Sequence, residues 1–160
     1  MSANPELVQQ ARSADPDARQ KAAYLVSHSA DAGDYPLMFE LLGDKDWRVR
    51  KTIVDGFVRD PRGEVIERLL DALADAENAG RRNSATEALV RIGEGAIPAI
   101  VSRLRARPDV DVRLSLVNLL GDLRSADGFD ALREALENET DVNVASTIIS
   151  SVGKFRDAAA

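Results

Sequence analysis

The chain of 160 residues lacks the side chains on which several kinds of site depend. It has no cysteine, which excludes disulfides, thiolate metal sites and cysteine nucleophiles. It has one histidine, His28, so no site that needs two imidazoles can form within the chain. Aromatic residues make up only 4% of the sequence, so a core must be built mainly from Leu, Ile, Val and Ala. We expect neither a metal site nor a cofactor.

Long hydrophobic runs and an excess of positive charge are also missing. No apolar stretch approaches the roughly 18 residues of a membrane span, and residues 1–6 lack the basic start of a signal peptide. We therefore expect a cytoplasmic protein. The formal net charge of −6 disfavours binding to nucleic acid, because contact with the phosphate backbone needs a dominant positive face.

The sequence does contain a repeat. Asp or Asn recurs at intervals of 31 or 32 residues, and a similar pattern of apolar positions follows each time. Such a period is typical of a stacked repeat array. Asp and Asn are favoured as helix N-caps because their side chains accept a hydrogen bond from a free backbone N–H, so each should begin a helix. The five residues are Asp15, Asp46, Asn78, Asp109 and Asp141.

The segment after each cap is predicted to be an amphipathic helix, which we name a B helix. Residues three, seven, ten and eleven positions after the cap are mostly apolar, and these offsets lie on one helical face. In the second unit this face includes Val49, Ile53 and Phe57. Glycine near the end of the segment is predicted to terminate the helix, because it tolerates positive φ. These glycines are Gly93, Gly121 and Gly153.

A second helix, which we name an A helix, is predicted before each B helix. A leucine recurs near its end, and apolar residues stand four and seven positions earlier. These leucines are Leu42, Leu73, Leu104 and Leu136. One pair of helices cannot bury its apolar face alone, so neighbouring pairs must stack. The pairs are predicted at about 4–28, 35–58, 64–92, 95–121 and 128–153.

These units resemble HEAT repeats, in the short bacterial form also found in phycobilin lyases. The resemblance rests on the segments DKDWRVRKTIVDGFV, RRNSATEALVRIG and DVDVRLSLVNLLG and covers nearly the whole chain. It implies an all-α fold, a right-handed α-α superhelix of about five helical hairpins in one HEAT-type solenoid over residues 1–160. It also implies a ladder of bonds between Asp and Arg residues of neighbouring units, broken at Ala145. The arginines of this ladder would be Arg19, Arg50, Arg82 and Arg113.

The last unit has no obvious cover for one side of its B helix, which carries Ile149 and Val152. Residues 153–156 match residues 121–124, so the sequence stops where a sixth A helix would begin. A terminal repeat normally presents a polar outer face. We infer a fragment of a longer array. The alternative is an end covered by a partner or by self-association through this C-terminal repeat.

Three features have both a structural and a functional interpretation. His28 is favoured as a helix-end histidine over a catalytic base, because an imidazolium there meets the negative end of the helix dipole. An arginine cluster at residues 103–107 could contact nucleic acid, but arginines at a helix end also complement the dipole and bury their stems. Trp47 is predicted to pack in the turn between its two helices, with an exposed binding anchor as the alternative.

The resemblance implies that the B helices line the concave side of the solenoid. Their outward columns hold mainly short hydroxyl and amide side chains, which leave room for a partner helix or peptide. We predict a non-enzymatic scaffold or regulatory module that binds a partner protein there. The alternative is an accessory domain of an enzyme, bilin-lyase-like or HEAT-like DNA glycosylase-like, with its chemistry elsewhere. The candidate binding residues are Tyr24, Lys51, Asp55, Glu87, Arg91, Leu114 and Asn118.

Overall fold

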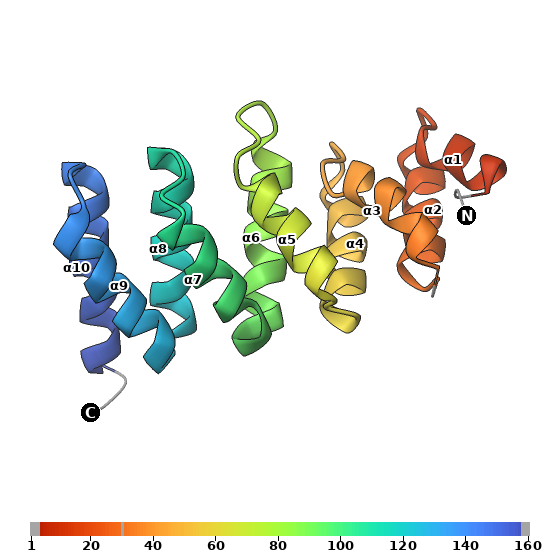
Figure 1. The fold of residues 1–160 in the computed structure, drawn as a ribbon. Coiled ribbons are helices and arrows are strands. Elements are labelled where there is room, and N and C mark those ends of the chain that lie inside the picture. Colours follow the sequence, from red (N-terminus) through yellow and green to blue (C-terminus); the bar gives the residue numbers. More distant parts are fainter. Residues whose placement is uncertain (1–3, 30, 158–160) are drawn as a thin grey trace.

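The computed structural model describes residues 4–29 and 31–157. Over these residues it contains α-helices and two short 3-10 turns but no strand. The helices form two layers of one elongated array, with α1 and α10 at opposite ends (Figure 1). The predicted all-α solenoid is confirmed.

Successive helices alternate between the two layers. The A helices are α1 (Pro5–Ala11), α3 (Tyr35–Leu41), α5 (Gly63–Ala72), α7 (Ile97–Arg105) and α9 (Ala126–Asn138). The B helices are α2 (Pro16–Ser27), α4 (Trp47–Arg59), α6 (Ala79–Ile92), α8 (Val110–Leu123) and α10 (Val142–Asp157). The 3-10 turns η1 (Ala32–Asp34) and η2 (Gly93–Ala96) lead into α3 and α7. Figure 1 shows the B helices standing in a row, with α5, α7 and α9 crossing in front of them.

Each predicted cap begins a B helix. The side-chain oxygens of Asp15, Asp46, Asn78, Asp109 and Asp141 accept backbone N–H groups of the first turn at 2.8–3.1 Å. A cap of this kind typically stabilises a helix by about 1 kcal/mol. The regular spacing of these five residues therefore sets where every B helix starts.

The core lies between the two layers and between successive units. The apolar face of α4 is fully buried, and Phe57 is its largest side chain. The B helices carry most of the packing between units: α2 lies against α4, α4 against α6, and α8 against α10. The contact between α6 and α8 is less extensive than these three. No described helix is long and apolar enough to cross a membrane.

Two of the three glycines predicted to end B helices lie inside them. Gly93 does end α6 and has a positive φ of 72°. Gly121 is buried within α8, where a Cβ atom would lie 2.8 Å from the Cβ and Oγ atoms of Ser151 on α10. Gly153 lies within α10, with no neighbouring atom within 4 Å of its Cβ position. The prediction was wrong here because close packing of α8 and α10, and not a chain reversal, requires the small residue at position 121.

The prediction that Trp47 packs between its helices was also wrong, because its side chain is 65% exposed. Trp47 is the first residue of α4, and the first residues of α2, α6 and α10 are exposed as well. Among the first residues of the B helices, only Val110 on α8 is half-buried against the core, and the others face solvent. The apolar character of the column after the cap therefore does not mark a core position.

Candidate partner-binding surface

The candidate binding residues lie on four successive B helices. Tyr24 on α2 is 56% exposed, and Asn118 on α8 is exposed. Leu114 is half-buried and packs partly against the core, so it offers less surface to a partner than its sequence position suggested. The other four residues lie on α4 and α6. We name the outward face of the five B helices the B surface.

Four of the candidate residues form one network that joins α4 to α6. Arg91 lies 2.6 Å from Asp55 and 3.4 Å from Glu87. Lys51 lies 3.5 Å from Asp55 and 3.7 Å from Glu87. Burial raises the pKa of Asp55, but the hydrogen bond from Arg91 and the charge of Lys51 outweigh it and hold that pKa below its usual value. The sequence predicted these residues singly, whereas the structure brings them together as two cations and two anions.

Other cations on this surface also reach back to the preceding unit. The Arg59 guanidinium donates a hydrogen bond of 3.0 Å to the backbone carbonyl of Ser27. Lys154 on α10 lies 2.7 Å from Asp122 on α8. Single exposed ion pairs are worth about 0–1 kcal/mol, so these links align neighbouring B helices more than they stabilise them.

His28 is the C-cap residue of α2 and is exposed, as predicted. Its Nδ1 atom lies 2.8 Å from the carbonyl oxygen of Tyr24, and the centres of the two rings are 4.1 Å apart. The histidine therefore holds Tyr24 in place at the N-terminal end of the B surface.

The ladder implied by the resemblance is present at two of its four positions. Arg19 donates two hydrogen bonds to Asp44 of the next unit, at 2.7 and 3.1 Å. Arg113 donates two to Glu139, at 3.0 and 3.1 Å. Each acid stands in the turn between the A and B helices, two residues before the cap. The Asx caps themselves therefore do not accept these bonds.

The arginines of the second and third units bind backbone oxygens of their own units. Arg50 donates to the carbonyl of Asp44, and Arg82 donates to that of Asp75. In the fourth unit Arg107 stands at the position that Asp44 and Glu139 occupy in the second and fifth units, and its φ is 53°. Arg82 therefore has no carboxylate in the turn of the fourth unit with which to form an ion pair. A cavity of about 610 Å³ lies at this junction, lined in part by Arg82 and Asp109.

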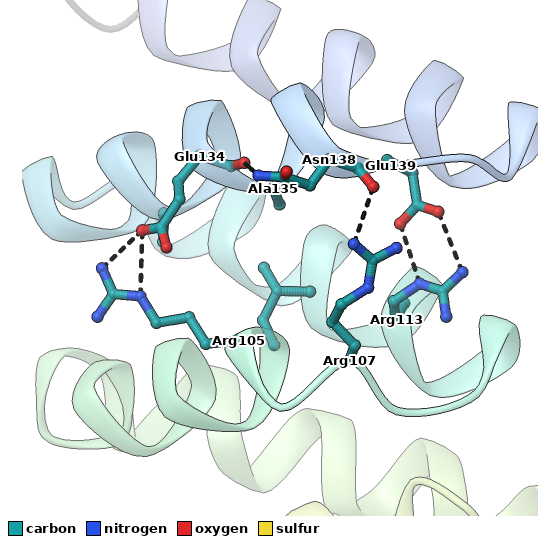
Figure 2. A pocket seen from close by; sticks show the side chains of 9 residues that line it. Arg105, Arg107, Arg113, Glu134, Ala135, Asn138 and Glu139 are labelled. Carbon is teal, nitrogen blue, oxygen red and sulfur yellow. Dashed lines mark hydrogen bonds and ion pairs between the residues drawn. The ribbon is translucent and has the colours of Figure 1, made fainter.

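The arginine cluster at residues 103–107 contacts protein oxygens. Arg103 pairs with Glu67 and Asp71 of α5, at 2.9 and 2.7 Å. Arg105 lies 2.8 Å from Glu134 of α9. Arg107 donates to a backbone carbonyl at the end of α9. Figure 2 shows Arg105, Arg107 and Arg113 directed at α9 and the residue after it, around a cavity of about 350 Å³. The structure therefore gives this cluster a role in joining A helices.

The Arg113–Glu139 pair makes stability depend on pH. The Glu139 side chain is only 4% exposed. Burial raises its pKa, but the backbone N–H groups of Asp141 and Thr140 and the Arg113 guanidinium together bring that pKa below its usual value. A depressed pKa in the folded state contributes stability above the unfolded pKa, and this contribution is lost as the pH falls through the folded pKa.

Replacement Glu139→Gln should therefore cost about 2 kcal/mol of unfolding free energy at pH 7. The difference from wild type should shrink as the pH falls below about 4, because protonation then removes the same charge from the wild type. Urea unfolding at several pH values measures this difference in unfolding free energy. Glu134→Gln, at an exposed pair, is the matched control and should change stability little. A difference for Glu139→Gln that does not shrink as the pH is lowered would contradict the assignment.

In the described part of the chain, the carboxyl groups with displaced pKa values lie in ion pairs and capped turns. Each of these pKa values is displaced downward, at Glu40, Asp46, Asp55, Asp75 and Glu139. A general acid at neutral pH needs the opposite displacement. Across residues 4–29 and 31–157, no group of three or more His, Cys, Asp or Glu residues is placed to hold a metal ion.

Comparison with known proteins supports the family suggested by the repeat. A family model described as HEAT repeats matches residues 4–90 and 97–160. No curated protein sequence matches the chain. The matched segments include the five capped B helices, except the last two residues of α6, and the A helices packed against them. The chain therefore belongs to the family of HEAT-repeat proteins.

Proposed function

We propose that the chain is a non-enzymatic cytoplasmic scaffold that binds a segment of a partner protein along the B surface. The observation that supports this most directly is the row of neighbouring B helices. Polar side chains on the outward face of α4 and α6 are joined by ion pairs. HEAT repeats generally serve as scaffolds for protein interaction, and the resemblance of this chain to them extends over its described length.

Helix packing supports the choice of this face. Neighbouring B helices contact one another more closely than neighbouring A helices do at most junctions. In a curved stack the closer layer lies on the inside, which supports placing the B surface on the concave side of the array. A concave side lets one extended or helical segment touch several units at once.

The chemistry of the B surface suggests a polar partner with both signs of charge. The network of Lys51, Asp55, Glu87 and Arg91 is neutral as a whole, so neither a strongly acidic nor a strongly basic partner is favoured. Charged side chains of the partner would form ion pairs with these four residues in place of the pairs that the four make with one another. Tyr24 supplies an aromatic anchor at one end of the surface.

Simultaneous replacement of Asp55 and Glu87 with lysine tests the proposal. The change leaves four cations together on α4 and α6, and partner capture from a native lysate should fall at least about tenfold. The control is Glu64→Lys with Glu137→Lys, which changes net charge equally at exposed residues on A helices. Thermal unfolding must show that both variants are folded at the assay temperature.

Capture of the same partner at equal yield by both double variants would remove the B surface from consideration. Loss of capture by the control alone would place the binding surface on the A helices. Either result would refute the proposal as it stands.

A further inference from the structure

The cavity beside Arg107 lies between the fourth and fifth units. Its walls come from α7, α8, α9 and the residues that follow α7 and α9, so it is formed within two units and does not involve the outer face of α10. Part of the lining is apolar: Leu104 and Ala131 are buried core residues, and Ala135 is half-buried beside them. A volume of about 350 Å³ is sufficient for a small ligand or for one residue of a peptide.

The charged side chains of this cavity do not balance. Three arginines and two glutamates line it, so one positive charge remains uncompensated. Two of the arginines form ion pairs with the two glutamates. The third, Arg107, donates a hydrogen bond of 2.8 Å to the carbonyl oxygen of Asn138, and no carboxylate of the described residues lies within ion-pair distance of it. Figure 2 shows the Arg107 guanidinium between the two ion pairs.

The junction between the first and second units provides an internal comparison. It contains two arginine–carboxylate pairs like those beside the cavity, Arg12 with Glu40 and Arg19 with Asp44. Two residues before the cap, however, the first unit has Ser13 where the fourth unit has Arg107. Two pairs are therefore sufficient to join neighbouring units. Arg107 is an addition, and its φ of 53° is unfavourable for a residue with a Cβ atom. An unfavourable residue that packing does not require indicates a functional role.

We propose that this cavity binds a carboxylate that carries a short apolar group. The carboxylate pairs with Arg107, and the apolar group lies against Leu104 and Ala135. A guanidinium presents parallel N–H groups that match the two oxygens of a carboxylate. One carboxylate also neutralises the single unbalanced charge, whereas a phosphate with nearly two charges would place excess negative charge beside the two glutamates. A small organic acid and the C-terminal residue of a peptide share this chemistry.

Titration of the wild-type chain with N-acetylleucine, followed by NMR, tests the proposal. The dissociation constant should be about 1 mM or lower, and the backbone amide signals of residues 104–107 and 131–139 should shift. N-acetylleucinamide has the same shape without the charge and should bind at least about tenfold more weakly. Acetate keeps the charge but lacks the apolar group, and it should also bind at least about tenfold more weakly.

A matched pair of variants assigns the binding to Arg107. Arg107→Gln should raise the dissociation constant of N-acetylleucine at least about tenfold, because it removes the charged donor. The control is Arg124→Gln, which makes the same change at an exposed arginine of left-handed backbone, φ 52°, that does not line the cavity. This variant should leave the dissociation constant unchanged. Circular dichroism should show that both variants keep the wild-type helix content.

A second acid distinguishes the two sources of the carboxylate. 4-Methylpentanoate has the carboxylate and the branched apolar group of N-acetylleucine but no amide. Equal binding of the two acids would support a small organic acid as the ligand. Tighter binding of N-acetylleucine would support the C-terminal residue of a peptide.

Three results would overturn the proposal. Absence of binding of both acids to the wild type at about 20 mM would show that the cavity is not a carboxylate site. Equal effects of Arg107→Gln and Arg124→Gln would show that the Arg107 guanidinium does not hold the ligand. Inorganic phosphate that binds more tightly than N-acetylleucine, and that Arg107→Gln releases, would make this a phosphate site. None of the candidate residues of the B surface lines the cavity, so these outcomes do not affect the proposed scaffold function.

Discussion

Replacement of Asp44 by alanine is expected to lower the free energy of unfolding by about 3 kcal/mol. Asp44 and Arg19 form an ion pair whose side chains are only 8% and 6% exposed. Removal of the carboxylate leaves the guanidinium buried without its counter-charge. It also removes the acceptor of the Asp46 backbone N–H, a hydrogen bond of 2.7 Å in the turn before α4.

The expected loss lies at the lower end of the range for broken buried pairs, about 3–5 kcal/mol. The reason is that Arg19 keeps the carbonyl oxygens of Ser13 and Ala14 as acceptors, at 3.0 and 3.1 Å. Urea unfolding followed by circular dichroism measures the change. Asp122→Ala removes the partner of Lys154 at an exposed pair and should cost no more than about 1 kcal/mol. Equal effects of the two variants would show that burial of the Arg19–Asp44 pair is unimportant.

Replacement of Gly121 by alanine is expected to destabilise the chain by about 2 kcal/mol, although alanine is the better helix former. The new Cβ would lie 2.8 Å from atoms of Ser151, so α8 and α10 must move apart. Gly153→Ala is the matched control, since it changes the same position of the next unit where the space is open. That variant should gain about 0.5–1 kcal/mol from helix propensity.

The test is whether Gly121→Ala lowers the free energy of unfolding while Gly153→Ala raises it. Thermal or urea unfolding at a concentration where the chain is monomeric measures both. Adding Ser151→Gly to Gly121→Ala should recover part of the loss, because it removes the side chain that the new methyl group meets. If both alanine variants stabilised the chain, the close approach of α8 and α10 would not be a constraint on position 121.

The sequence predicted the fold well because one local rule repeats along it. An Asx cap followed by apolar residues at helical spacing was sufficient to locate every B helix. The same local reasoning misplaced Trp47 and Gly121. In the sequence alone, an apolar residue at the first position of a helix cannot be distinguished from a core residue. A glycine late in a helix cannot be distinguished from one that terminates the helix. Only the packing of one unit on the next distinguishes these cases.

The candidate surface was less predictable than the fold. The column pattern placed Lys51, Asp55, Glu87 and Arg91 on the outward side of the B helices, but it could not show that they meet. That depends on the offset between α4 and α6, which residue spacing within one helix does not determine. The partner acids of Arg19 and Arg113 were missed for a similar reason. A signal was present, since an acid stands two residues before the cap in the second and fifth units.

The arginine at position 107 also has a consequence for cooperativity. Units of a solenoid contact mainly their neighbours, so its stability is a sum of unit terms and of coupling terms at each junction. At the junction of α6 and α8 the buried pair that Arg19 and Arg113 make with the next unit is missing, and the B helices touch less than at the other junctions, although Arg103 on α7 still pairs with α5. We expect the coupling term to be smallest there, so that the first opening of the native state separates residues 4–92 from residues 97–157.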